Sequence, residues 1–222
     1  MSGTHTRPAD IERTSMSIIA EELKARGIVL PRENEAVVKR VIHTTADFDY
    51  VENLRFTPDA VAKGVRAMDR GVIVTDTNMA LAGISKPTLA QLGGMARCFM
   101  AEPFIADAAR EQGTTRAAVS MDWALREYPN AVLAVGNAPT ALLRIAELLE
   151  AGKRPALVIG VPVGFVNVVE SKERLLEACL RYEVPAIVAL SRKGGSNVAA
   201  AICNALLYTA ADALDPADRG WQ

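Results

Sequence analysis

Short runs of apolar residues alternate with longer segments of helical periodicity along most of the chain. The runs contain almost no position suited to facing water, which is typical of strands buried on both faces of a parallel sheet. Gly, Pro, Asn or Ser residues follow most of them, as expected where strands end. The predicted strands cover residues 72–74, 98–100, 132–135, 156–159 and 186–190.

Segments with apolar residues three or four positions apart predict helices before and between these strands. Thr57 is a candidate N-cap followed by Pro58 at the first helical position, and Gly71 is a candidate end for that helix. Residues 48–56 mix apolar and polar positions and fit either a strand or an ordered loop. The predicted helices cover residues 8–27, 33–44, 57–71, 103–112, 116–127, 139–151, 172–182 and 197–214.

This alternation predicts a doubly wound α/β fold, with a mostly parallel sheet and helices on both faces. No internal repeat, low-complexity linker or change of composition marks a boundary, so we expect a single domain over residues 1–222. The first two helices form an N-terminal addition to that domain, and residues 1–8 are expected to fray.

Composition narrows the function classes further. Half of the 222 residues are hydrophobic, which excludes a disordered chain, and 25 basic against 26 acidic residues leave no basic field for nucleic acid. No apolar run approaches the ~20 residues of a membrane span, and no signal peptide is expected. The three cysteines form no C-x-x-C pair, so neither a disulfide framework nor a zinc ribbon is indicated. We therefore expect a cytoplasmic protein with reduced thiols.

Polar and glycine residues collect directly after four of the predicted strands, at residues 75–78, 136–140, 160–165 and 191–197. The carboxyl ends of parallel strands meet at one edge of the sheet, where ligands bind in such folds. One such cluster is explained by ordinary turn chemistry, but four on a common edge favour a binding site.

The chemistry of this edge favours an anionic ligand with apolar bulk. Helix N-termini and glycine backbone offer N–H donors, and Arg192 and Lys193 precede one predicted helix start while Arg116 begins another. The motifs G-x-x-x-x-G-K-[ST] and G-x-G-x-x-G are absent, which excludes a P-loop and a dinucleotide fingerprint. Pro162 and Phe165 place apolar bulk between glycines, which suits a broad organic ligand.

Histidine is scarce, with only His5 in the predicted tail and His43 at the end of an apolar helix. A positive charge on His43 would be favoured by the helix C-terminus, and imidazole is a suitable general acid near neutral pH. A surface or core imidazole without a function is the alternative interpretation. No second histidine is available beside His43 to form a two-histidine metal site. The G-x-S-x-G motif of many serine hydrolases is absent.

Six segments of the chain, spread from about residue 11 to 207, together resemble the precorrin-8X methylmutase family and its cobalt-precorrin-8 counterpart. In sequence letters they read VIHTTAD, DTNMA, TRAA, GNAPTAL, GVPVGFVNVVESK and RKGGSNVA. The resemblance implies a flavodoxin-like α/β fold, a homodimer, and an isomerase of cobalamin biosynthesis. It also implies that no cofactor is needed, because the reaction is unimolecular and redox-neutral.

In that reaction a methyl group of a corrin-type macrocycle moves from C-11 to C-12 and gives hydrogenobyrinate or its cobalt form. His43 matches the catalytic histidine of the family, and Ser17 matches a substrate-binding serine. We expect the polycarboxylate substrate to be bound by Ser17, Arg116, Asn137, Gly164, Arg192, Lys193, Gly194 and Ser196. Two alternatives stay open, namely a corrinoid carrier that would not need His43 and a phosphate-binding α/β module that would need a phosphate loop.

Overall fold

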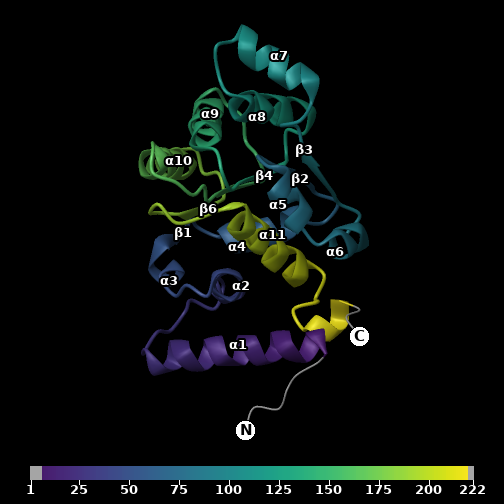
Figure 1. Ribbon diagram of the computed structural model, residues 1–222, viewed down its shortest axis with the longest axis vertical. Helices are drawn as coiled ribbons and strands as arrows, with labels where there is room; N and C mark the ends of the chain where they lie inside the picture. Colours follow the sequence, from purple (N-terminus) through teal and green to yellow (C-terminus); the bar gives the residue numbers. More distant parts are fainter. Residues whose placement is uncertain (1–6, 220–222) are drawn as a thin grey trace.

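The computed structural model of the protein describes residues 7–219. Its strands form one six-stranded sheet in the order β1-β6-β5-β4-β2-β3 (Figure 1). Strands β2 to β6 are parallel, and β1 pairs antiparallel with β6 at one edge. The parallel strands follow the flavodoxin-like order, with the direction of winding reversing between β2 and β4. The strands are β1 Leu54–Phe56, β2 Val72–Thr75, β3 Met95–Cys98, β4 Val132–Val135, β5 Leu157–Gly160 and β6 Ala186–Ala189.

Helices cover both faces of this sheet, as the sequence predicts. Helices α8, α9 and α10 pack on one face, and α4, α5, α6 and α11 pack on the other (Figure 1). The helices are α1 Pro8–Ala25, α2 Glu35–Thr45, α3 Tyr50–Asn53, α4 Ala60–Ala67, α5 Asn78–Gly83, α6 Lys86–Gln91, α7 Pro103–Glu111, α8 Arg116–Glu127, α9 Pro139–Glu150, α10 Val168–Arg181, α11 Ser196–Ala210 and the short 3-10 helix η1 Pro216–Arg219.

The central strands alternate their side chains between two apolar cores. Val132 and Ala134 of β4 join the core under α11, whereas Leu133 and Val135 join the core under α8 and α9. All four are fully buried, which explains why strand positions read as continuously apolar in the sequence.

The strand predicted at residues 98–100 is misplaced, because the structure has β3 at Met95–Cys98. This strand lies at the edge of the sheet and pairs with β2 alone, so its side chains alternate between exposed and half-buried. The more apolar Phe99 and Met100 follow the strand and pack against the α8 side of the molecule. The continuously apolar run in the sequence therefore extends into the loop after the strand, whereas the strand itself has alternating side chains.

Thr57 does not cap a helix. Its Oγ1 accepts a hydrogen bond from the N–H of Ala186 at 2.8 Å, and so joins the end of β1 to the start of β6. Helix α4 begins only at Ala60, after Asp59 turns the backbone with a positive φ of 58°.

Several other helices and strands differ in their bounds from the prediction. Residues 48–56 contain both α3 and β1, and the short helices α5 and α6 were not predicted. Helix α10 starts at Val168, earlier than the predicted residue 172, and α11 ends at Ala210 rather than at residue 214. Helix α1 begins at Pro8, the first residue of the helix predicted over residues 8–27. Residues 1–6, which include His5, lie outside the described residues.

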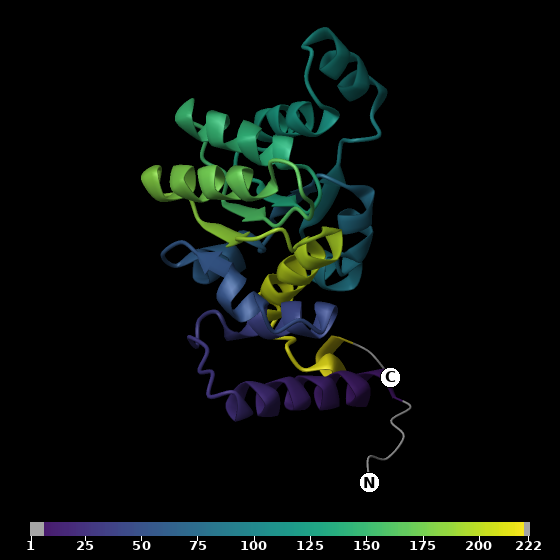
Figure 2. The same ribbon diagram turned by 60° about the vertical axis from the view of Figure 1, so that its left-hand side comes forward.

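The N-terminal helices form a third layer beside the sheet domain. Helix α2 packs along α11, and α1 packs on α2 and on η1 near the C-terminus (Figures 1 and 2). Helix α11 therefore lies between the sheet and the N-terminal helices, and residues from both ends of the chain approach it.

Candidate active site

The four polar clusters meet at the carboxyl edge of the sheet, where the sequence analysis expected them. The hydroxyl groups of Thr77 and Ser196 lie 2.7 Å apart and join the loops after β2 and β6. A Cβ on Gly136 would lie 2.7 Å from the Cα of Ser196, so only glycine lets the loop after β4 approach this closely. The clusters therefore form one continuous rim.

Several glycine N–H groups of this rim are already bonded within the protein. The N–H of Gly164 donates to the carbonyl of Arg192 at 3.1 Å, and the N–H of Gly195 donates to that of Val161 at 2.8 Å. A Cβ on Gly194 would lie 2.1 Å from the carbonyl oxygen of Val161. These glycines pack neighbouring loops against each other, and Gly164 and Gly195 do not present their N–H groups to a ligand.

The carboxylate of Asp76 joins the loops that follow β2 and β4, at the point where the direction of winding reverses. This side chain is fully buried and accepts hydrogen bonds from the N–H groups of Gly136, Asn137 and Ala138 at 2.9, 2.8 and 2.8 Å. Burial raises the pKa of Asp76 against the lowering effect of these three donors. The backbone N–H of Asn137 is therefore bonded to Asp76 and not available to a ligand, whereas the side chain of Asn137 is exposed.

The position of Asp76 argues against the alternative that the protein is a phosphate-binding module. Ligands of doubly wound sheets bind at this reversal point, and a helix start with several N–H donors is a ready anion site. Here the protein supplies its own anion, which occupies the donors and repels a phosphate. The sequence analysis noted Asp76 in a polar cluster but missed this role, although a carboxyl directly after a buried strand was a usable signal.

His43 lines a cavity of about 520 Å³ between the N-terminal helices and α11. Such a volume lies within the range of about 300–1,000 Å³ for small-molecule sites. The exposed surface of the lining is mostly apolar, although seven of its thirteen residues are polar or charged. It consists of Pro8, Ile11, Glu12, Arg40, His43, Thr44, Gly83, Asn197, Ala200, Ala201, Asn204, Tyr208 and Arg219.

A buried charge cluster lies beside His43 in this cavity. Glu12 lies between two guanidinium groups, with Arg40 at 2.7 Å and Arg219 at 2.6 Å from its carboxylate oxygen. The ring of Tyr208 lies 5.1 Å from the guanidinium carbon of Arg40 and 4.1 Å from that of Arg219. Burial raises the pKa of Glu12, but hydrogen bonds from both arginines outweigh burial and hold it below its usual range. Two cations and one anion leave a positive charge near His43.

The environment of His43 favours its neutral form. Burial lowers the pKa of its imidazole below 6.5, the charge of Arg40 lowers it further, and Glu12 opposes both. The C-terminus of α2 was expected to raise the pKa of His43. That effect is outweighed, because burial destabilises the imidazolium more than the helix dipole stabilises it. In the protein without ligand, imidazole is the main form at neutral pH.

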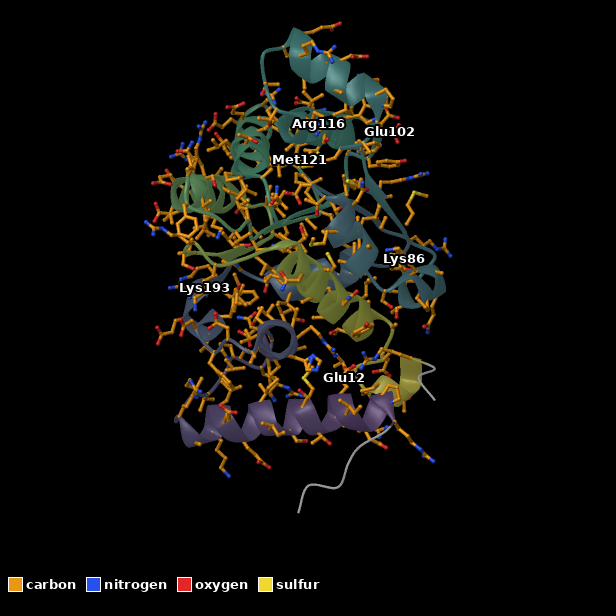
Figure 3. All side chains as sticks on the ribbon, in the orientation of Figure 1. Glu12, Lys86, Glu102, Arg116, Met121 and Lys193 are labelled. Carbon is orange, nitrogen blue, oxygen red and sulfur yellow. The ribbon has the colours of Figure 1, made fainter. Side chains whose placement is uncertain are left out.

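The two rim cations have different surroundings. The ammonium of Lys193 lies 2.6 Å from a carboxylate oxygen of both Asp47 and Asp49, which raise its pKa (Figure 3). Lys193 thus connects the rim to the loop that follows the His43 helix. Arg192 is exposed, and its guanidinium carbon lies 5.4 Å from the ring centroid of Phe165.

None of the eight residues predicted for substrate binding lines the His43 cavity, and two of them, Ser17 and Arg116, also lie away from the rim. Ser17 is exposed on α1 and does not line that cavity. Arg116 donates to the carbonyl of Met100 at 3.3 Å, at the end of the molecule opposite Glu12 (Figure 3). The structure therefore brings His43 close to the β6–α11 end of the rim, whereas Ser17 and Arg116 lie elsewhere on the chain.

Residues 7–219 contain neither a cluster of metal ligands nor a helix that could span a membrane. No group of three or more His, Cys, Asp or Glu side chains there is placed to hold a metal ion. No helix in the same residues is long and apolar enough to cross a bilayer. The three cysteines are unpaired, and burial raises the pKa of both Cys179 and Cys203 to about 12.

Comparison with known proteins adds independent evidence. A family model described as precorrin-8X methylmutase matches residues 10–209. The cobalt-precorrin-8 methylmutase of Salmonella typhimurium is 46% identical and aligns over 91% of this chain and 95% of its own. The precorrin-8X methylmutase of Pseudomonas aeruginosa is 39% identical, with 88% and 93% covered.

A solved structure agrees with these sequences. The crystal structure of precorrin-8X methylmutase from Thermus thermophilus superposes with a TM-score of 0.82 at 39% identity, over 91% of this chain and 96% of that one. The chain is therefore a member of the precorrin-8X methylmutase family.

Proposed function

We propose that the protein moves a methyl group of precorrin-8X, or of its cobalt-containing counterpart, from C-11 to C-12, with His43 as general acid or base. The observation that carries this proposal is the position of His43, the single histidine within residues 7–219, in the wall of a mostly apolar cavity. Relatives named cobalt-precorrin-8 methylmutase and precorrin-8X methylmutase support the substrate class.

The reaction requires the protein to deliver a proton and to hold the macrocycle in a reactive conformation. One carbon–carbon bond breaks at C-11, one forms at C-12, and the conjugated double bonds shift, so no atom or electron leaves the molecule. Protonation next to the migration site polarises the conjugated system and lowers the barrier. One placed general acid contributes about 10²–10⁴-fold in rate.

Substrate binding itself would adjust the charge of His43. The lowered pKa of its imidazole results from burial and from Arg40. A polycarboxylate beside His43 adds negative charge, which favours imidazolium and moves the pKa back toward neutrality. In this account the general acid is formed when the substrate is bound, in a cavity from which water is displaced.

The cavity and the rim suit different parts of the substrate. Small residues of the cavity wall, Gly83, Ala200 and Ala201, leave room for a flat macrocycle along α11. The carboxylate arms would reach the rim at Arg192, beside the N-terminus of α11, which no side chain caps. Ser17, Arg116, Asn137, Lys193, Gly194 and Ser196 remain proposed contacts of those arms. Gly164 remains a proposed substrate contact through its Cα, since its N–H is bonded to the carbonyl of Arg192.

We further propose that the protein works in the cytoplasm as a homodimer. Support comes from exposed apolar side chains on the rim or directly after its clusters, where Phe165 is 82%, Val166 75% and Met79 71% exposed. Large exposed apolar groups are typical of surfaces that a partner or ligand covers.

Turnover of precorrin-8X by the purified protein tests the proposed function. Because the shift alters the conjugated system, the visible spectrum should change progressively with many substrate molecules converted per protein. A spectrum that changes only up to one ligand per site, with no conversion, would instead favour the corrinoid carrier.

A further inference from the structure

Lys172 of α10 is a fully buried lysine below the rim. Within the described residues its ammonium has two partners, the carbonyl oxygens of Ser191 at 2.6 Å and Lys193 at 2.9 Å. Burial lowers its pKa to about 8, so the ammonium form still predominates at neutral pH. A buried charge is costly, and these two carbonyl groups are what stabilises it.

The two carbonyl groups belong to the neighbours of Arg192 on either side. The carbonyl of Arg192 itself accepts the N–H of Gly164 at 3.1 Å. Three consecutive carbonyl groups of the loop are therefore held from within the protein, two by Lys172 and one by the loop after β5.

The backbone of this loop would not adopt its shape without such contacts. Ser191 has a φ of 117°, in a region that favours glycine, and Gly194 has a φ of 157°. A non-glycine residue keeps such a conformation only where surrounding interactions enforce it. The hydrogen bond from Lys172 to the Ser191 carbonyl is one of those interactions.

We infer that Lys172 is a positioning residue, which holds the loop so that Arg192 presents its guanidinium to a substrate carboxylate. This inference rests on the proposed function, since it assumes that the rim binds a polycarboxylate. Lys172 has no exposed surface and does not touch the substrate itself. Its effect on binding must therefore pass through the loop and through Arg192.

A double-mutant cycle tests the inference. Binding of hydrogenobyrinate, the reaction product, is measured by visible-absorbance titration for the wild type, Arg192→Ala, Lys172→Met and the double variant. Arg192→Ala is expected to weaken binding about tenfold, as for loss of one charge-assisted contact. Lys172→Met should weaken it by a similar factor, and the double variant by little more than either, because both changes remove the same contact.

The KM and kcat of turnover distinguish a displaced loop from a folding defect. Loss of a contact made equally in the ground and transition states raises KM and leaves kcat unchanged, whereas partial unfolding lowers the apparent kcat. Lys172→Gln, whose side chain is shorter and uncharged but keeps N–H donors, should give a smaller loss in the same direction. This variant carries the comparison if Lys172→Met does not fold.

Lys153→Met serves as the control, because Lys153 is exposed beyond the C-terminal end of α9. It should bind and turn over substrate like the wild type. Independent effects, with Arg192→Ala still costing tenfold in a Lys172 variant, would overturn the inference, as would wild-type binding by both Lys172 variants. A wild-type protein that fails to bind the corrin refutes the proposed function, whereas full binding by Arg192→Ala refutes only the role of Arg192 and of Lys172 through it.

Discussion

At the scale of single residues, the neighbours of His43 decide its charge more than its place on a helix does. Arg40 lies on the same helix, but Glu12 reaches His43 from α1 and Arg219 reaches the cluster from η1. Glu12 and Arg219 are 207 positions apart in the sequence. No local pattern reveals such a cluster, so the sequence could nominate His43 but could not predict which protonation state predominates.

This environment predicts the pH dependence of catalysis. If His43 must carry a proton, kcat/KM should rise as the pH falls through neutrality, because the pKa of His43 lies below 6.5 in the protein without ligand. Glu12→Gln removes the one neighbouring charge that raises this pKa. The limb of the profile should therefore move to lower pH.

The measurement is kcat/KM against pH for the wild type and Glu12→Gln, with Glu22→Gln as a control from an exposed ion pair on the same helix. A limb that stays in place in Glu12→Gln, or moves to higher pH, would contradict the assignment of that limb to His43.

At the scale of elements, the sequence predicted the buried strands well because strands covered on both faces leave little room for polar residues. It failed at β3, whose edge position exposes alternate side chains, and at α5 and α6, which are too short to show a period. The binding rim was predictable from strand ends alone. The partners of its N–H groups were not, because Asp76 meets Gly136 across 60 positions of sequence.

The contact between two rim loops leads to a prediction about Gly136. A Cβ there would lie 2.7 Å from the Cα of Ser196 and 2.8 Å from the carbonyl oxygen of Gly195. Both are backbone atoms, so no change of side-chain rotamer could relieve the clash. Gly136→Ala should push the start of α11 away from β4, destabilise the fold by about 1–3 kcal/mol and weaken corrin binding.

Urea unfolding and the visible titration measure these two effects. Gly152→Ala is the matched control, since Gly152 has a positive φ of 90° but open space around its Cα. It should cost stability through backbone strain and leave corrin binding unchanged. Wild-type stability and binding in Gly136→Ala would show that the loops can separate without loss.

At the scale of the whole molecule, one chain leaves its proposed site incomplete. Ser17 and Arg116 lie outside the His43 cavity, and the apolar side chains of the rim are exposed. We therefore predict a homodimer, which sedimentation at micromolar concentration should report as a species of twice 23.8 kDa. Interfaces of stable homodimers typically bury about 2,000 Å² or more. A single species near 23.8 kDa would reject the dimer.

The central claim is that His43 moves a proton in a protein that isomerises its corrin ligand. The most direct measurement compares His43→Asn with the wild type in turnover of precorrin-8X and in binding of hydrogenobyrinate. A neutral amide cannot deliver a proton near neutral pH, so turnover should fall by about 10²-fold or more while product binding stays nearly unchanged. Turnover by His43→Asn at the wild-type rate would remove His43 from the mechanism and contradict this account.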